Sequence, residues 1–175
     1  LTHEELIHNC IFILNAGHET TTNLIGNGIN ALLENPDQLA QLRQAPELID
    51  TAVEEFLRFE SPNQLGNRMT VAPVEIGGEL INPGTRIWLC IGGANRDPAV
   101  FAEPDRRELA RDPNPHLAFA AGMHTCVGLN VARMEGRIAI ARMVDRFPEL
   151  QRTDTVKRAS RARFRGLESL PLKVE

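Results

Sequence analysis

Apolar residues near the start of the chain recur with the period of an α-helix. A capping box precedes them, with Thr2 as the N-cap and Glu5 three residues later. The apolar positions are Leu6, Ile7, Cys10, Ile11 and Leu14, and the spacing resumes at Leu24, Ile25, Leu32 and Leu33. This pattern predicts one long helix from about Thr2 to Glu34.

The middle of this predicted helix is polar and weak in helix propensity. Gly17 costs about 1 kcal/mol relative to Ala in a helix interior, and the run Thr20-Thr21-Thr22 is also unfavourable. We therefore expect a local distortion of the helix at this point. The alternative interpretation is that the threonine hydroxyls hydrogen-bond to carbonyls of the preceding turn.

The rest of the chain contains helical patterns, strand signals and one long irregular stretch. Helical patterns cover 39–43, 48–57 and 127–144. Strand signals bounded by turn residues cover 68–71, 74–76, 79–81 and 86–91. Residues 94–115 are rich in Pro, Asp and Arg without periodicity, and 162–174 could form a small hairpin. We expect a mainly α fold with a small β portion.

Composition narrows the classes of function. The chain has 175 residues, 42% of them hydrophobic, and no apolar run approaches the roughly 20 residues of a membrane span. Three cysteines cannot form a complete set of disulfides, and the polar residues 1–5 do not resemble a secretion signal. The net charge of −4 argues against nucleic-acid binding. We therefore expect a cytoplasmic protein with neither a membrane nor a nucleic acid as partner.

The charge is unevenly distributed along the chain. Residues 151–175 carry seven Lys and Arg against three Asp and Glu. This basic segment is either a solvated surface or a docking face for an acidic partner.

Cys126 lies between Gly122 and Gly128, directly before the last helical pattern. The free N–H groups and the positive dipole end of a helix N-terminus favour thiolate over thiol. Glycines on both sides let the backbone approach a flat or bulky group. A lone thiolate in this setting suits a nucleophile, a redox thiol or an axial ligand of haem iron. A buried structural cysteine is the alternative.

The segment Phe119-x-x-Gly122-x-His124-x-Cys126-x-Gly128 resembles the haem-binding loop of the cytochrome P450 family. Three further segments resemble motifs of that family and follow in its order. They are the oxygen-activation motif AGHETT at 16–21, the ExxR motif EFLR at 55–58 and the meander at 95–106. The sequences AGHETT and ANRDP (94–98) are most similar to the corresponding motifs of the soluble bacterial branch of the family.

The resemblance implies a fold. Residues 1–175 would be the C-terminal, haem-ligating part of a single cytochrome P450 domain whose N-terminal part is absent. The implied elements are the long central helix, the ExxR helix, β hairpins, the meander, the haem-binding loop and the last long helix.

The resemblance also implies roles for individual residues. Cys126 would be the proximal thiolate ligand of the iron in haem b. Glu19 and Thr20 would form the acid–alcohol pair that relays protons, and Arg68 and His124 would bind the haem propionates. The implied haem contacts are Ala16, Arg68, Phe119, Gly122, His124, Cys126 and Gly128.

Other residues match structural or substrate-lining positions of the family. Glu55, Arg58 and Arg106 would form an ion network behind the haem loop, and Glu55 and Arg58 share a helix face at i, i+3. The segments that match the substrate pocket are 16–17, 61–66 and 165–167.

The implied reaction is insertion of one oxygen atom from O₂ into a small hydrophobic organic substrate. Its electrons would come from NAD(P)H through a ferredoxin-type or flavodoxin-type partner. Two alternatives remain: a truncated haem-binding fragment without activity of its own, and a thiol enzyme with Cys126 as nucleophile.

Two residues depart from the family pattern. Ala120 replaces the usual first glycine of the haem loop, and we expect a modest effect if its backbone angles are ordinary. Arg107 stands where the meander usually has Phe, which predicts altered local packing.

Overall fold

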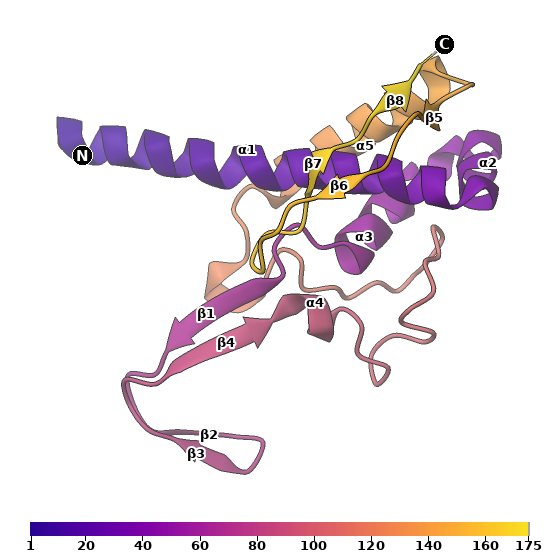
Figure 1. The fold of residues 1–175 in the computed structure, drawn as a ribbon. Helices are drawn as coiled ribbons and strands as arrows, with labels where there is room; N and C mark the ends of the chain where they lie inside the picture. Colours follow the sequence, from indigo (N-terminus) through magenta and orange to yellow (C-terminus); the bar gives the residue numbers. More distant parts are fainter. Residues whose placement is uncertain (175) are drawn as a thin grey trace.

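A computed structural model describes residues 1–174 (Figure 1). The helices are α1 (His3–Glu34), α2 (Pro36–Gln44), α3 (Ile49–Phe59), α4 (Ile91–Ala94) and α5 (Leu129–Arg146), with short 3₁₀ turns η1 (Pro46–Leu48) and η2 (Gly122–His124). The strands are β1 (Leu65–Met69), β2 (Val74–Ile76), β3 (Glu79–Ile81), β4 (Arg86–Cys90), β5 (Gln151–Arg152), β6 (Lys157–Arg158), β7 (Leu167–Ser169) and β8 (Leu172–Lys173). The expected mainly α fold with a small β portion is confirmed.

The long helix α1 begins at the predicted capping box. The N–H of Glu5 donates to Oγ1 of Thr2 at 3.2 Å, and the N–H of Thr2 donates to Oε2 of Glu5 at 2.7 Å. The helix then runs without interruption to Glu34, so the predicted distortion in its middle is wrong. The hydroxyls of Thr20 and Thr22 each donate, at 2.9 Å, to the carbonyl four residues earlier, which is compatible with regular helix geometry.

The core lies where the C-terminal half of α1 meets α3 and α5. Its most buried members include Leu24, Leu32, Val53, Phe56 and Ile140. Gly28 permits the close approach of the three helices, because a Cβ there would lie 2.7 Å from Cδ1 of Ile140 and 2.9 Å from Cδ2 of Phe56. This packing fixes α1 relative to the ExxR helix α3 and to the last long helix α5.

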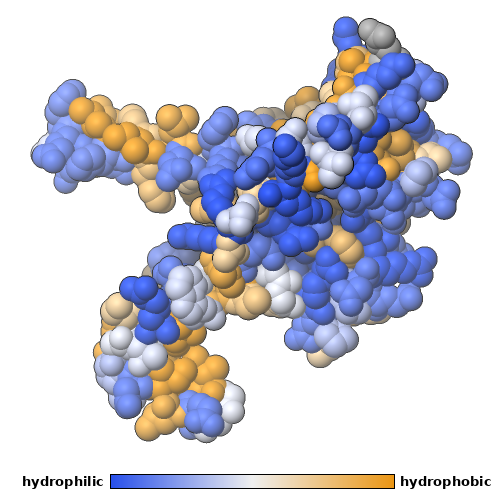
Figure 2. All heavy atoms as spheres, in the orientation of Figure 1, coloured by the Kyte–Doolittle hydropathy of each residue, from blue (hydrophilic) through white to orange (hydrophobic). Residues whose placement is uncertain are grey.

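The N-terminal half of α1 projects away from this core (Figure 1). Its apolar stripe is exposed, with Ile11 at 60%, Phe12 at 68% and Leu14 at 71%. Figure 2 shows this stripe as a hydrophobic band along the projecting helix. A second exposed apolar set lies on α5 and consists of Val131, Met134 and Ile138. Apolar surface of this extent is typical of a contact face.

The predicted strands between 68 and 91 form two antiparallel pairs. Strand β1 pairs with β4, with Arg68 opposite Ile87, and β2 pairs with β3 in a hairpin. The two pairs form an arm that extends from the helical part of the molecule (Figure 1). The first strand starts at Leu65, three residues before the predicted position.

The hairpin predicted within 162–174 does not form. Strand β7 pairs instead with β6, and β8 pairs with β5. The turn lies earlier, where the N–H of Ala159 donates to the carbonyl of Gly166 at 3.1 Å. Pro171, between β7 and β8, has no N–H to donate, and its carbonyl accepts from Thr153 at 3.2 Å. Among residues 1–174, no helix combines the length and the apolar character that crossing a membrane requires.

Candidate functional site

Two fully buried charges on α3 organise the segment that precedes the cysteine loop. Arg58 Nε lies 2.7 Å from Oε2 of Glu55, and Nη2 lies 2.8 Å from Oε1. Both side chains have no exposed surface. The spacing i, i+3 on a helix places them on one face, as expected.

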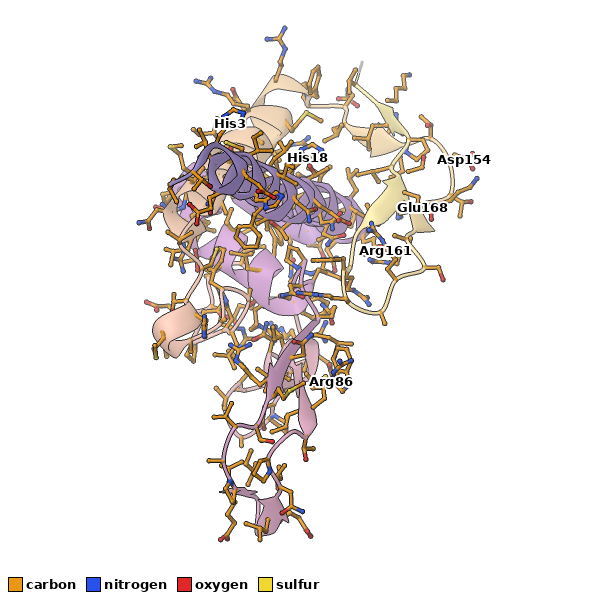
Figure 3. The ribbon with its side chains drawn as sticks, turned by 90° about the vertical axis from the view of Figure 1, so that its left-hand side faces the viewer. His3, His18, Arg86, Asp154, Arg161 and Glu168 are labelled. Carbon is orange, nitrogen blue, oxygen red and sulfur yellow. The ribbon has the colours of Figure 1, made fainter. Side chains whose placement is uncertain are left out.

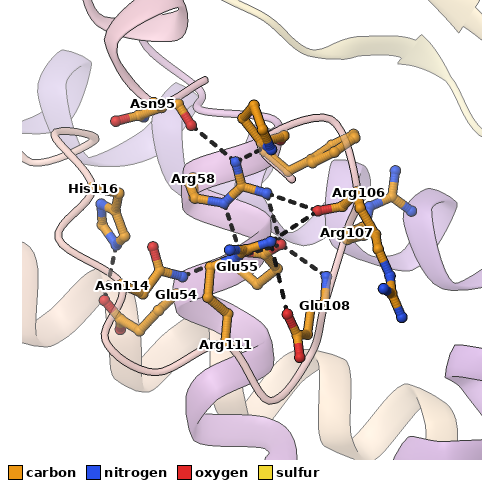
Figure 4. A network of polar contacts seen from close by, with 12 residues as sticks. Glu54, Glu55, Arg58, Asn95, Arg106, Arg107, Glu108, Arg111, Asn114 and His116 are labelled. Carbon is orange, nitrogen blue, oxygen red and sulfur yellow. Dashed lines mark hydrogen bonds and ion pairs between the residues drawn. The ribbon is translucent and has the colours of Figure 1, made fainter. Parts of the chain in front are cut away.

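This pair holds the long irregular segment mainly through its backbone (Figure 4). Arg58 donates to the carbonyls of Asn95, Pro104 and Arg106 at 2.9, 2.8 and 3.1 Å. Glu55 accepts from the N–H of Glu108 at 2.8 Å and from the amide of Asn114 at 3.2 Å. The stretch from 95 to 114 therefore follows a fixed path without helix or strand.

The predicted role of Arg106 in the ion network needs correction. Its carbonyl accepts from Arg58, but its own guanidinium points to the surface and pairs with Glu103 at 3.0 Å. The third charge is Arg111, whose Nε lies 3.2 Å from Oε2 of Glu55 and whose side chain is 8% exposed. Sequence inspection missed Arg111 because nothing distinguishes it from the other arginines of this segment.

Arg107, which replaces the usual Phe of the meander, fills its position by stacking. Its guanidinium lies 4.5 Å from the centroid of the Phe59 ring, and Arg96 lies 3.4 Å from the same ring. Nη1 of Arg107 donates to the carbonyl of Ala31 at 2.7 Å. Burial lowers the pKa of Arg107 from its ordinary value, against the opposing effect of Glu60. The long stem and the stacked head thus provide packing that an aromatic ring would otherwise give.

A second polar cluster, which the sequence did not indicate, supports the start of the cysteine loop. Glu54 accepts from Arg133 of α5 at 2.7 and 2.8 Å and contacts Nε2 of His116 at 3.0 Å. Burial raises the pKa of the Glu54 carboxyl, but the hydrogen bonds of His116 and Arg133 outweigh it and hold that pKa at about 2. The ring of Phe119 lies 6.0 Å from that of His116 and 4.8 Å from the guanidinium of Arg133.

The cysteine loop closes on itself through its backbone. The N–H of Cys126 donates to the carbonyl of Phe119 at 2.9 Å. The hydroxyl of Thr125 donates to the carbonyl of Gly122 at 2.8 Å. Gly122 has φ of +73°, a left-handed conformation that suits glycine. Ala120 has φ of +59°, so the condition of ordinary backbone angles is not met and this alanine is strained.

Cys126 is exposed and lies three residues before the first residue of α5. Gly128 caps that helix, and a Cβ at this glycine would lie 4.0 Å from Sγ of Cys126. The sulfur therefore lies beside the N-terminus of α5, where the first N–H groups have no partner within the helix. The structure presents an exposed cysteine at this helix end, and its role as a thiolate ligand stays a prediction.

The other predicted site residues lie on separate elements. Arg68, on β1, is exposed and donates to the carbonyl of Asn67 at 2.8 Å, and His124 is an exposed residue of η2. Ala16 is an exposed position of α1, one turn before Thr20. Glu19 forms an ion pair with Arg161 of the loop between β6 and β7. Among residues 1–174, no hydrogen bond joins the Glu19–Thr20 pair to the cysteine loop.

Comparison with known proteins places these features in a family. A model of the family described as cytochrome P450 matches residues 1–164. The biotin biosynthesis cytochrome P450 of Bacillus subtilis (strain 168) is 46% identical over 176 residues, which cover 100% of this chain and 45% of that protein. Cytochrome P450 107B1 of Saccharopolyspora erythraea is 45% identical over 177 residues, which cover 99% of this chain and 44% of that protein.

The fold matches solved structures equally well. The crystal structure of P450BioI in complex with hexadec-9Z-enoic acid ligated acyl carrier protein aligns with a TM-score of 0.97 at 46% identity. The alignment covers 100% of this chain and 46% of that one. The chain therefore spans slightly less than half the length of the relatives that it matches.

Proposed function

Since this chain belongs to the cytochrome P450 family of haem monooxygenases, we propose that the protein containing it inserts one oxygen atom from O₂ into a small organic substrate. The observation that carries the proposal is the exposed Cys126 at the N-terminus of α5, in a loop closed by its hydrogen bond to Phe119. We further propose that residues 1–175 form the C-terminal part of a single domain.

The residues present fit a haem group. Arg68 and His124 are exposed and form no ion pair with a carboxylate among residues 1–174, so they are available to bind propionates. A Cβ at Gly122 would meet nothing within 4 Å, which leaves open space beside the loop. Cys126 would ligate the iron, and Ala16, Phe119, Gly122 and Gly128 would contact the ring. When bound, the haem supplies the binding and reductive activation of O₂.

In this proposal α5 would support Cys126 as an iron ligand, because the cysteine lies three residues before the first residue of the helix and Gly128 caps the helix between them. The cluster of Glu54, His116 and Arg133 would act on Cys126 indirectly. It packs against Phe119 and thereby holds the cysteine loop in place. These three are positioning residues rather than catalytic ones.

Glu19 and Thr20 would move protons between solvent and the site of O₂ chemistry that a bound haem would supply. The Thr20 hydroxyl donates its proton to the carbonyl of Ala16 in this structure, so it must rotate to donate elsewhere. The Glu19 carboxylate would accept protons from solvent and pass them to Oγ1 of Thr20. Such a short relay would limit the water that has to enter the site.

The partners follow from the reaction. Two electrons per turnover would come from NAD(P)H through a ferredoxin-type or flavodoxin-type protein that docks on the face near Cys126, and we propose a cytoplasmic location. One relative of known structure was solved with hexadec-9Z-enoic acid ligated acyl carrier protein. A long-chain acyl group is therefore one candidate within the class of small hydrophobic substrates.

The test is an absorption spectrum of the haem-loaded protein, reduced and bound to CO, with Cys126→Ala measured alongside. We expect a red-shifted Soret band of the thiolate type that the variant loses. Exposed Cys90 provides the matched control, since Cys90→Ala should retain the band. A band that survives in Cys126→Ala would refute the assignment of the iron ligand.

One observation favours a second candidate function for these 175 residues by themselves. The apolar stripe of α1 around Ile11 and Leu14 is exposed, so the isolated chain leaves contact surface without a partner. The alternative is a haem-binding fragment without turnover. Residues 1–175 would be identified as such a fragment if they show the thiolate-type band with CO but form no product from O₂ and substrate.

A further inference from the structure

Three arginines surround a pocket of about 300 Å³ between the C-terminal strands and the β1–β4 pair. Arg158 ends β6, and Arg161 and Arg165 lie on the loop that leads to β7. Gln64, Leu65 and Cys90 form the opposite wall. A pocket with apolar wall atoms and convergent cations is suited to an organic anion.

Two of these arginines are held by one carboxylate. Nη1 of Arg158 lies 3.2 Å from Oε2 of Glu60, and Arg165 contacts the same carboxylate through Nε and through Nη2 at 3.3 Å. The Glu60 side chain is only 9% exposed. Because a single negative charge faces two positive ones, the pocket keeps an excess of positive charge.

Arg161 is the most exposed of the three arginines. Its side chain is 55% exposed, and its only carboxylate partner among residues 1–174 is Glu19 of α1. Oε1 of Glu19 is enclosed, and its side chain is 27% exposed, so the pair is open to solvent on the side of the arginine. Because a guanidinium has five N–H donors and more than half of the Arg161 side chain is exposed, donors remain for a second carboxylate. Figure 3, which looks along α1 from its N-terminus, shows Arg161 on the loop beside that helix.

Glu19 has an alternative partner within its own helix. Asn23 lies one turn further along α1, is 8% exposed, and its Nδ2 has no acceptor. Residues four apart share a helix face. A Glu19 carboxylate that left Arg161 would have this unsatisfied amide on its own helix face, and a hydrogen bond between them would offset part of the cost of releasing Arg161.

We propose that Arg161 binds a carboxylate group of the substrate, and that the Glu19 carboxylate occupies Arg161 until the substrate arrives. The substrate class is a carboxylic acid with an apolar chain, because the guanidinium pairs with carboxylates in a bidentate geometry and Leu65 and Cys90 line the pocket. The inference rests on the proposed monooxygenase function, because the bound carboxylic acid would be the substrate of that reaction and Glu19 belongs to its proposed proton relay.

The test compares octanoate with 1-octanol, which share a chain and differ in charge. Binding to the full-length, haem-loaded protein is measured by calorimetry at pH 7.5. We expect the wild type to bind octanoate at least 10-fold more tightly than 1-octanol, and Arg161→Gln to abolish this preference. Glu19→Gln should bind octanoate more tightly than the wild type, because the internal competitor is gone.

Arg163→Gln is the matched control. Arg163 lies on the same loop, 5.3 Å over the ring of Phe164, and is not part of the pocket. This variant should keep the preference for octanoate. The proposal is overturned if octanoate does not bind the wild type, if Arg161→Gln keeps the preference, or if both arginine variants lose it equally.

The CO-bound spectrum of each variant separates this proposal from the proposed function. A thiolate-type band in Arg161→Gln shows that the variant is folded and loaded with haem. Loss of the octanoate preference with that band intact supports the carboxylate site. Absence of the band from the wild type would instead overturn the proposed haem ligation, while calorimetry would still report on Arg161.

Discussion

Arg58 and Glu55 face each other on α3 at 2.7 Å, and neither side chain has any exposed surface. Removal of Arg58 breaks this buried pair, leaves Glu55 with Arg111 as its remaining charge partner, and removes the donor to the carbonyls of Asn95 and Pro104, which together cost about 3–5 kcal/mol. We therefore expect Arg58→Met to lower the free energy of unfolding by about that amount in urea denaturation. Arg106→Met is the control, since that side chain is 67% exposed and should change the value by less than about 0.5 kcal/mol. Equal effects of the two substitutions would contradict the central role of the buried pair.

The strained Ala120 predicts a stabilising substitution. A left-handed conformation costs a non-glycine residue roughly 1–2 kcal/mol, partly offset by the greater freedom of glycine in the unfolded chain. Ala120→Gly should therefore raise the free energy of unfolding by up to about 1 kcal/mol. Ala121 has φ of −148°, so Ala121→Gly should be neutral or destabilising. Thermal unfolding of the two variants under the same conditions distinguishes them, and a more stable Ala121→Gly would refute the argument.

The depressed pKa of Glu54 predicts a pH dependence of stability. The pKa is about 2 in the folded chain against 4.5 ordinarily, so the folded state favours the charged carboxylate. The stabilisation is fully present above pH 4.5 and is lost as the pH falls towards 2. We expect the difference in unfolding free energy between the wild type and Glu54→Gln to be constant above about pH 5.5 and to shrink below pH 4.5.

The control for this prediction is Glu149→Gln. Glu149 is exposed and forms no ion pair among residues 1–174. The free energy of unfolding of Glu149→Gln, measured by urea denaturation between pH 2.5 and 7, should stay close to that of the wild type at each pH. If the wild type and Glu54→Gln lose the same unfolding free energy below pH 4.5, the Glu54 carboxylate is not the source of the pH dependence.

Thr20 and Thr22 offer a matched pair for the proton relay. Each hydroxyl donates at 2.9 Å to a carbonyl four residues earlier, so their structural roles in α1 are alike. In the full-length protein, Thr20→Ala should release hydrogen peroxide and form less product per NAD(P)H consumed. Thr22→Ala should keep the coupling of the wild type. The measured quantity is the ratio of product to NAD(P)H, and equal ratios for Thr20→Ala and the wild type would exclude the relay.

Local sequence patterns predicted the elements that depend on neighbouring residues. The capping box of Thr2 and Glu5 and the face shared by Glu55 and Arg58 follow from spacings of three residues, and both are present. The family membership rested on motifs of the same local kind, and the comparisons confirm it. The roles assigned to Cys126, Glu19 and Thr20 stay predictions.

Contacts between distant segments were not accessible from the sequence. The ion pair of Arg111 with Glu55 spans 56 residues, and the contact of Arg133 with Glu54 spans 79. Nothing local distinguishes these arginines from exposed ones. The predicted hairpin within 162–174 failed for the same reason, because β7 and β8 pair with strands that precede the segment.

The way in which Glu55 and Arg58 hold the stretch from 95 to 114 affects how that stretch can vary among related proteins. Most of the bonds end on carbonyls and N–H groups, which every residue type supplies apart from the missing N–H of proline. Substitution of the side chains at 104, 106 and 108 therefore leaves these bonds intact. Insertion or deletion of a single residue would shift the carbonyl and N–H groups that follow it out of reach of Arg58 and Glu55. Positions 104, 106 and 108 should therefore tolerate changes of side chain while the length of the stretch stays constant.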